Sequence, residues 1–269
     1  MLSARGDGGV KMIIAFRGNG TSEVSVNAAV YALWRAKKGE GRVLFFSVRR
    51  GEGNPEHFFL RRNAALEKKS CGTGMETLRK LVVAGKADEK GVSGCMRQVT
   101  AGLDILYGNY PEEMRLAVEY REGLFQILDC LQNYYTLIIC DAGRQEDWLG
   151  ELVIKRAALV VHGTEQNVRH LRELLSRPPL LQGEPYRFYL FGRYDCESKY
   201  SLYNLRRRFG GLTCRNSAGI PHCTQVWDAC MDGELAAEWE RWERIAVSEE
   251  VRKYIEAVRR FDREISRRI

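Results

Sequence analysis

Two glycines and two hydroxyl residues form the segment with the clearest chemical meaning. They are Gly18, Gly20, Thr21 and Ser22. An apolar run at residues 12–16 precedes them, and an alanine-rich pattern with helical spacing follows. Glycines allow a tight backbone whose N–H groups converge on an anion, and the N-terminus of a helix favours negative charge. The order of strand, glycine turn and helix therefore predicts a phosphate-binding loop.

The same loop lacks the lysine that a working phosphate-binding loop requires. That lysine precedes the Ser or Thr that contacts Mg²⁺, and this chain has Thr21 before Ser22. Glu23 follows in the first helical turn, where its carboxylate satisfies the helix dipole and repels a triphosphate. A strand, turn and helix that bind no ligand is an equally good interpretation of this segment alone.

A few other polar residues could complete a site beside the loop. Asp141 ends an apolar run, where a carboxylate can support a bound Mg²⁺ or simply cap the next turn. Arg17 and Arg49 follow other apolar runs, and arginine binds phosphate well enough to replace a missing lysine. The sequence favours the alternative in which both arginines are solvated loop residues. His162 also ends an apolar run and is predicted to be structural.

The composition indicates a cytoplasmic protein with a substantial core. Of 269 residues 45% are hydrophobic, the first residues lack the apolar segment of a signal peptide, and no apolar run is long enough to span a membrane. The eight cysteines include no Cys-x-x-Cys pair, so free thiols are expected. One group matches no common zinc spacing and is not expected to bind metal: Cys214, His222, Cys223 and Cys230.

Basic residues outnumber acidic ones by 42 to 35, which gives a net charge of +7. The excess is concentrated in residues 251–269 and in the group Arg206, Arg207, Arg208 and Arg215. Such patches bind nucleic acid, anionic lipid or acidic partners, although most are only solvated faces. Residues 251–269 also carry an apolar stripe that is predicted to pack on the core. The basic face opposite that stripe could lie on a membrane surface.

Apolar runs alternate with amphipathic helical patterns along the chain. The predicted strands are residues 12–16, 42–48, 103–106, 135–140, 158–162 and 187–191. The predicted helices are residues 22–37, 75–84, 111–132, 165–175, 201–209, 226–232 and 251–265. Residues 85–100 are polar and glycine-rich and are predicted to be a loop. This alternation predicts a three-layer α/β/α fold with a mostly parallel sheet, whose ligands bind at the carboxyl ends of the strands.

Several segments in a fixed order resemble the MinD/ParA group of P-loop ATPases, which carry a deviant Walker A loop. Residues 16–27, FRGNGTSEVSVN, align with the pattern KGGxGKTTxxxN of that group. The other matching segments are residues 39–48, 103–110, 133–143, 157–175 and 219–233. The resemblance implies a P-loop NTPase fold. It also implies a single domain over residues 1–269, with a C-terminal helical region at 236–269.

The resemblance implies which residues would bind ATP or ADP with Mg²⁺. Ser22 would be the metal ligand, and Asp141 would stand at the Walker B position. The full set of cofactor-binding residues implied by the resemblance is Gly18, Asn19, Gly20, Thr21, Ser22, Glu23 and Asp141.

The chain departs from the family pattern where charge is most needed. The lysine that grips the phosphates is replaced by Thr21, and the deviant lysine that reaches the nucleotide of a dimer partner is replaced by Phe16. Family aspartates are replaced by Ser47, Arg49 and Ala157. Because phosphoryl transfer depends on positioning and charge stabilisation, these changes predict negligible ATP hydrolysis.

Within the group, residues 103–141 most resemble the TadZ/CpaE branch, which helps place Flp/Tad pilus machinery at a cell pole. The leading hypothesis is a catalytically degenerate localisation or assembly factor rather than an enzyme. It would bind proteins of secretion or pilus assembly, alone or as a homodimer, in the cytoplasm or peripherally at the inner membrane or cell pole. The alternative is an active ATPase of ParA or MinD type in DNA partition or cell-division positioning.

Overall fold

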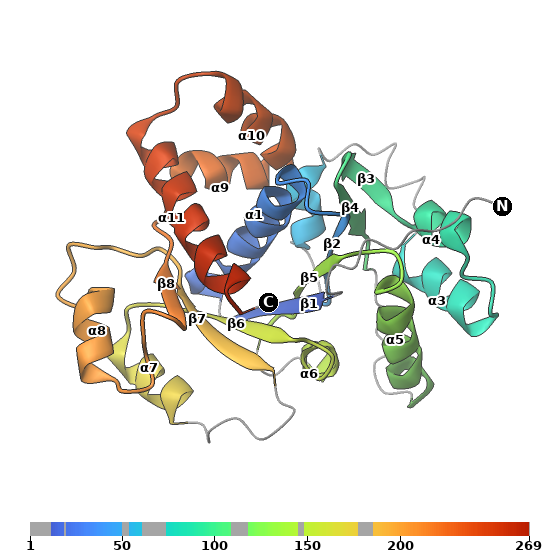
Figure 1. Cartoon of the computed structure of the whole chain (residues 1–269), viewed down its shortest axis with the longest axis horizontal. Coiled ribbons are helices and arrows are strands. Elements are labelled where there is room, and N and C mark those ends of the chain that lie inside the picture. The colour runs from blue at the N-terminus through green and yellow to red at the C-terminus, as the bar shows by residue number, and fades with distance from the viewer. Residues whose placement is uncertain are drawn as a thin grey trace.

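An eight-stranded sheet passes through the centre of the described structure (Figure 1). The computed structural model describes residues 12–18, 20–49, 54–60, 74–108, 118–144, 148–176 and 185–268. The strand order is β3-β4-β2-β5-β1-β6-β7-β8. Every neighbouring pair is parallel except β3 and β4, which are antiparallel. The predicted mostly parallel sheet is therefore confirmed.

The strands and helices alternate along most of the chain. The strands are β1 (Met12–Gly18), β2 (Val43–Ser47), β3 (Arg97–Thr100), β4 (Leu103–Leu106), β5 (Leu137–Asp141), β6 (Leu159–Thr164), β7 (Tyr186–Phe191) and β8 (Ser217–Gly219). The first helices are η1 (Gly20–Ser22), α1 (Val24–Lys37), η2 (Pro55–Phe59), α3 (Met75–Val83), α4 (Glu89–Cys95), α5 (Val118–Leu131) and α6 (Trp148–Ile154). The later helices are α7 (Val168–Leu175), α8 (Leu202–Arg208), α9 (Thr224–Met231), α10 (Leu235–Arg244) and α11 (Glu249–Ser266).

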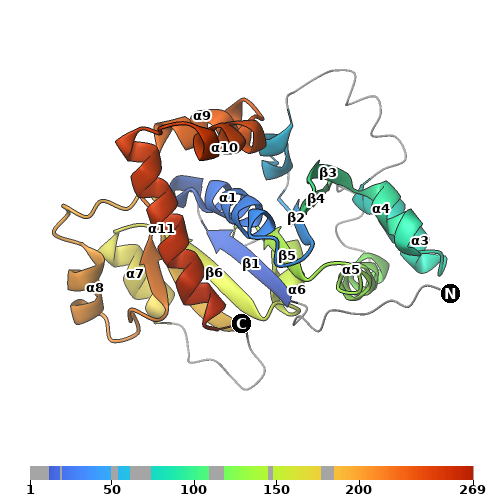
Figure 2. The same ribbon diagram turned by 45° about the horizontal axis from the view of Figure 1, so that its top comes forward.

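Helices cover both faces of the sheet and complete three layers. One face carries α1, α9, α10 and α11, which lie together in Figure 2, and the other carries α3, α5, α6 and α7. Successive residues of β1 point to opposite faces, so Ile14 and Phe16 enter one apolar core while Ile13 and Ala15 enter the other. Because β1 is buried on both sides, its sequence is a continuous apolar run.

The C-terminal helix α11 is fixed against α1 and β1. The ring centroid of Phe261 lies 6.1 Å from that of Phe16. Beside it, the buried Asp262 carboxylate accepts hydrogen bonds from the Tyr31 hydroxyl at 3.2 Å and from Lys38 Nζ at 2.9 Å. The apolar stripe predicted for this part of the chain packs on the core, which leaves the charged face of α11 toward solvent.

Residues 85–100 correct the sequence analysis, because they form α4 and β3 rather than a loop. Asp88 Oδ1 accepts the N–H of Gly91 at 2.7 Å and so caps the start of α4. β3 is a partly exposed edge strand, so no apolar run reveals it in the sequence. α6, β8 and α10 are not among the predicted elements, and the first two have only seven and three residues.

Several predicted helix starts differ from the structure by two or three residues, and one falls outside it. The helices predicted from residues 165, 226 and 251 begin instead at Val168, Thr224 and Glu249. α1 begins at Val24 rather than Ser22, because the short helix η1 occupies Gly20–Ser22. The helix predicted at residues 111–132 corresponds to α5, and residues 111–117 lie outside the described residues.

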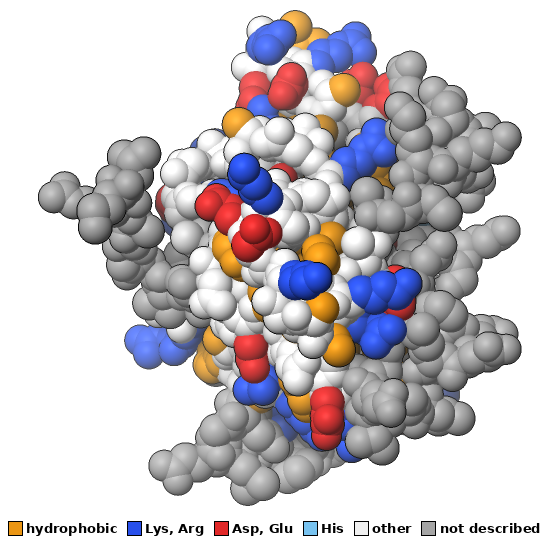
Figure 3. Space-filling view, turned by 90° about the vertical axis from the view of Figure 1, so that its right-hand side faces the viewer, with side chains coloured by type: hydrophobic (Ala, Val, Ile, Leu, Met, Phe, Trp, Pro, Cys, Tyr) orange, Lys and Arg blue, Asp and Glu red, His pale blue; other side chains and the backbone are white. Residues whose placement is uncertain are grey.

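The side of the molecule that carries α3, α4 and β3 has mixed charge. Figure 3 shows Lys and Arg side chains interspersed with Asp and Glu over the described part of this face. The basic excess of the sequence is therefore not gathered into one block here. Among the described helices, none is both long and apolar enough to cross a membrane.

Candidate functional site

The carboxyl ends of the parallel strands bring several of the predicted site residues to one edge of the sheet. In the register of β1, β2 and β5, Phe16 and Ser47 both pair with Asp141. On the other side of β1, Gly18 pairs with Gly163 of β6. Open parallel sheets bind ligands at this edge. The loop after β1 and Asp141 therefore share one candidate site.

The loop after β1 lies directly against the ends of β6 and β7. Glycines make this close approach possible. A Cβ on Gly18 would lie 2.7 Å from the Gly163 carbonyl oxygen, and a Cβ on Gly192 would overlap the Ser22 carbonyl oxygen. The Gly18 N–H donates to the Gly143 carbonyl at 3.1 Å. Because Ser22 is only 1% exposed, its hydroxyl lies between the strand ends rather than toward solvent.

Glu23 precedes the first turn of α1 in a left-handed backbone conformation. Its φ is 50° and its ψ is 27°, values that are uncommon for a residue with a side chain. The carboxylate is buried, and its Oε1 lies 2.6 Å from His222 Nδ1 and 3.9 Å from Arg193 Nε. A negative group is therefore held at the positive end of the helix, the place that an anionic ligand of this loop would take.

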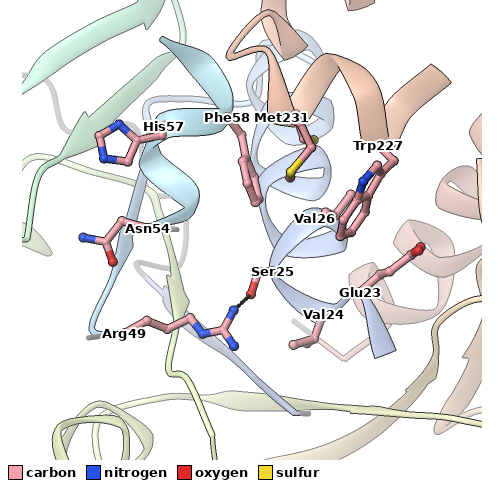
Figure 4. A pocket seen from close by; sticks show the side chains of 11 residues that line it. Glu23, Val24, Ser25, Val26, Arg49, Asn54, His57, Phe58, Trp227 and Met231 are labelled. Atoms are coloured by element: carbon pink, nitrogen blue, oxygen red, sulfur yellow. Dashed lines mark hydrogen bonds between the residues drawn. The ribbon is translucent and has the colours of Figure 1, made fainter. Parts of the chain in front are cut away.

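Asp141 and Arg49 face each other across the ends of β5 and β2. Asp141 is fully buried, and its Oδ1 accepts the N–H of Gly143 at 3.1 Å, as a cap of the following turn. Arg49 Nε lies 3.9 Å from Asp141 Oδ2, and Arg49 Nη1 donates to Ser25 Oγ at 2.6 Å (Figure 4). The guanidinium group thus joins the Walker B position to the first turn of α1.

Arg17 lies within β1 and is 5% exposed. The alternation of the strand directs it to the face that α6 covers, where its Nη2 lies 2.8 Å from Glu151 Oε1. The expectation that Arg17 and Arg49 are solvated loop residues is wrong for Arg17, which lies buried in β1. Arg49 does follow β2 in a loop, but its guanidinium group is bound by Ser25.

The positions taken from the family pattern differ widely in exposure. Thr21 is exposed, whereas Phe16 is fully buried in the aromatic core. Asn27 is buried and accepts a hydrogen bond from the Tyr254 hydroxyl at 2.9 Å, which ties α1 to α11. Asn19 lies outside the described residues.

The sequence analysis did not anticipate a buried carboxyl group near this edge. Glu56 of η2 is fully buried, and its Oε1 accepts the N–H of Ser47 at 2.8 Å. Burial raises the pKa of Glu56 to about 8, although backbone N–H groups oppose the increase. The sequence carries no signal for this residue, since glutamate is usually exposed.

The remaining predicted residues have structural surroundings. Arg206 donates from Nε to Ser217 Oγ at 3.0 Å and from Nη2 to the Ser217 carbonyl at 2.7 Å, so the basic group is partly structural. His162 is buried and stacks on Tyr189 with ring centroids 5.8 Å apart. In the described part of the chain, no group of three metal-ligating side chains comes together.

As arranged, the loop fits a magnesium nucleotide poorly. It has no lysine, the Ser22 hydroxyl is enclosed, and a buried Glu23 carboxylate at the first turn of α1 would repel a phosphate. These residues can hold the first turn of α1 against β6 and β7. Among the described residues, the nearby Arg49 and Arg193 already contact protein groups.

Comparisons with solved structures agree on one fold. The chain is similar to a ParA family ATPase from Chlorobium tepidum, with 13% identity over 95% of this chain and 99% of that one and a TM-score of 0.69. A putative plasmid partition protein from Borrelia burgdorferi bound to AMPPNP has 12% identity over 96% and 99% of the two chains and a TM-score of 0.60. MinD in the MinC:MinD complex of Aquifex aeolicus has 13% identity over 93% and 95% and a TM-score of 0.59.

No protein-family model and no curated protein matches the sequence. At identities this low, the similarity establishes the fold alone. The chain has the three-layer α/β P-loop fold of the ParA and MinD ATPases.

Proposed function

We propose that this chain is a ParA/MinD-like protein without ATPase activity that acts through protein partners as a localisation or assembly factor. The observation that carries the proposal is the contact of the buried Glu23 carboxylate with His222 at the first turn of α1. That carboxylate takes the position of the anion in a phosphate-binding loop, and Thr21 stands where a lysine would balance the phosphate charge. We therefore expect weak or no nucleotide binding.

Calorimetry with ATP and ADP in the presence of Mg²⁺ tests this proposal. The wild-type chain is expected to give no binding heat at millimolar nucleotide. The double substitution Thr21→Lys with Glu23→Gly, which restores the lysine and removes the carboxylate, is expected to bind more tightly than wild type. Micromolar binding by the wild-type chain, or steady phosphate release from ATP, would overturn the proposal.

A second candidate, an active ATPase, is favoured by the position of Arg49 between Asp141 and Ser25. In such an enzyme Arg49 would supply the charge of the missing lysine, and Ser22 would contact Mg²⁺. Turnover that Arg49→Ala abolishes and that Arg193→Ala leaves intact would establish this candidate. Absence of turnover at high protein concentration would exclude it.

The cellular role proposed for this factor is placement of Flp/Tad pilus machinery at a cell pole. The resemblance to the TadZ/CpaE branch supports it, and pilus ATPase and pilin genes beside this gene would add support. A neighbouring gene for a centromere-binding protein would instead favour DNA partition. Any homodimer should be independent of nucleotide, so sedimentation with and without ATP should give the same molecular mass.

A further inference from the structure

A cavity of about 400 Å³ opens beside the first turn of α1, and Glu23, Ser25 and Arg49 of the candidate site form part of its wall. Its apolar wall combines three elements and consists of Val24, Val26, Phe58, Trp227 and Met231 (Figure 4). This volume is at the lower end of the range for ligand pockets. It therefore suits one or two side chains of a bound segment better than an extended molecule.

Two apolar side chains at the α9 side of this cavity are exposed. Trp227 is 37% and Met231 is 51% exposed, and the two lie one turn apart on the same side of the helix. Tryptophan and methionine are enriched in protein interfaces, where they fill pockets of the partner or line its contact surface. Together with the cavity they form a continuous apolar surface.

The neighbouring face of α9 is acidic. Asp228 and Asp232 are exposed, lie one turn apart, and carry no ion pair within the described structure. In the cavity wall the Glu23 carboxylate and the Arg49 guanidinium group carry opposite charges, and Glu23 already contacts His222, so the excess of acid is that of Asp228 and Asp232. On a chain of net charge +7, this local excess of acid attracts basic groups.

The cavity wall also contains an acceptor without a partner. Asn54 donates from Nδ2 to the Gly108 carbonyl at 3.1 Å, which fixes the orientation of its amide. Its Oδ1 is buried and has no hydrogen-bond partner among the described residues. Because this oxygen is closed to solvent, it offers no direct contact to a bound segment, and recognition depends on the apolar wall and on Asp228 and Asp232.

We propose that the cavity and the Trp227–Met231 edge of α9 bind a segment of a partner protein in which an apolar side chain lies next to Lys or Arg. The apolar side chain enters the cavity between Phe58 and Met231, and the basic side chain meets Asp228 and Asp232. This inference rests on the proposed function, because a factor that acts through other proteins needs a surface that binds them.

Selection of displayed random 12-residue peptides on the full chain, without nucleotide, tests the inference. Enriched peptides are expected to carry an apolar residue beside Lys or Arg. Their affinity, measured by fluorescence anisotropy, should fall about tenfold or more for Trp227→Ala. The affinity of the wild-type chain for these peptides should also decrease as the salt concentration rises, and the Asp228→Lys variant should bind them more weakly than the wild type. Tyr203→Ala, at another exposed aromatic residue, is the control and should leave affinity unchanged.

Three results would overturn the inference: no enrichment, enrichment of acidic peptides, or binding that survives both Trp227→Ala and Met231→Ala. A dimer that Trp227→Ala converts to monomer would show that a second copy of this chain takes the surface instead. Repeating the anisotropy with MgATP separates the inference from the proposed function. Peptide binding that requires MgATP would support the docking site and contradict a factor that works without nucleotide. Absence of both nucleotide binding in calorimetry and peptide binding would support the proposed function and contradict the docking site.

Discussion

Nδ1 of His222 lies 2.6 Å from Oε1 of Glu23 and joins the first turn of α1 to the segment that precedes α9. The two residues are 199 positions apart, yet both sit at the edge where the parallel strands end. Arg193 Nε adds a second basic group 3.9 Å from the same carboxylate oxygen. The loop after β1 cannot open toward a ligand without breaking this contact.

The left-handed conformation of Glu23 can be separated from its contact with His222 by two substitutions. Glu23→Ala removes the contact and leaves a Cβ at a φ of 50°, whereas Glu23→Gly removes the contact and relieves the backbone. We expect Glu23→Ala to lower the free energy of unfolding by about 1–3 kcal/mol. Glu23→Gly should be the more stable of the two by about 1 kcal/mol. Urea unfolding measures both values, and equal stability of the two variants would contradict a strained Glu23.

The close contact between the loop and Gly192 predicts that a side chain at this position lowers the free energy of unfolding. A Cβ at this position would overlap the Ser22 carbonyl oxygen, so Gly192→Ala should cost about 2 kcal/mol or more. Gly210→Ala is the matched control, because a Cβ there meets nothing within 4 Å. We expect the control to be neutral or slightly stabilising. Thermal unfolding of the two variants compares them directly, and a well-tolerated Gly192→Ala would mean that the loop sits farther from β7.

The buried Glu56 carboxyl predicts a specific pH dependence. Its pKa is about 8 in the folded protein, whereas an ordinary glutamate, as in the unfolded chain, has a pKa of 4.5. Between these values the unfolded chain loses a proton that the folded chain keeps, so the free energy of unfolding falls as pH rises. The slope is at most about 1.4 kcal/mol per pH unit, and the contribution is constant below and above this window.

Glu56→Gln isolates this contribution, because its amide does not ionise. The difference in unfolding free energy between the variant and the wild type should shift in favour of the variant from pH 5 to pH 8, on the order of 1 kcal/mol per unit. Denaturant unfolding at several pH values measures it. A pH-independent difference would show that Glu56 is ionised in the folded state.

The Asp262 carboxylate predicts a large local contribution to the docking of α11. It is buried and accepts from Tyr31 and Lys38, and its Oδ1 lies 3.6 Å from Arg35 Nη1. Asp262→Ala leaves these groups without their partner and should cost about 2–4 kcal/mol, the exposure of Lys38 moderating the loss. Glu264→Ala, two residues further along the same helix, is the control. It removes an ion pair with the exposed Arg267 and should cost about 0.5 kcal/mol or less. Chemical denaturation that ranks the two variants equally would rule out the buried network.

Much of the fold could be predicted because the parallel strands are buried on both faces. Residues such as Ile13 and Ile14 face opposite cores, and this requirement produces the apolar runs that the sequence displays. β3 and β8 could not be found this way, because edge strands are short and partly exposed. α10 carries alternating charge with only three buried side chains, so its pattern is typical of a solvated segment as well.

The candidate site could be predicted only as far as strand ends are predictable. The loop residues and Asp141 follow apolar runs, and parallel topology brings such positions together. The partners of Glu23 and Arg17 could not be anticipated, since His222 and Glu151 come from distant segments with no apolar signal of their own. The surroundings of Glu56 depend on the packing of η2, which sequence spacing does not encode.

The motif resemblance aligns Phe16 with the deviant lysine of the ParA and MinD group, and the Phe16 ring lies 5.9 Å from that of Tyr31 and 6.1 Å from that of Phe261. A lysine at this position would carry an ammonium group into an aromatic core, at a cost of several kcal/mol. A lysine at residue 16 would therefore need compensating changes in both α1 and α11, whose Tyr31 and Phe261 pack against this ring.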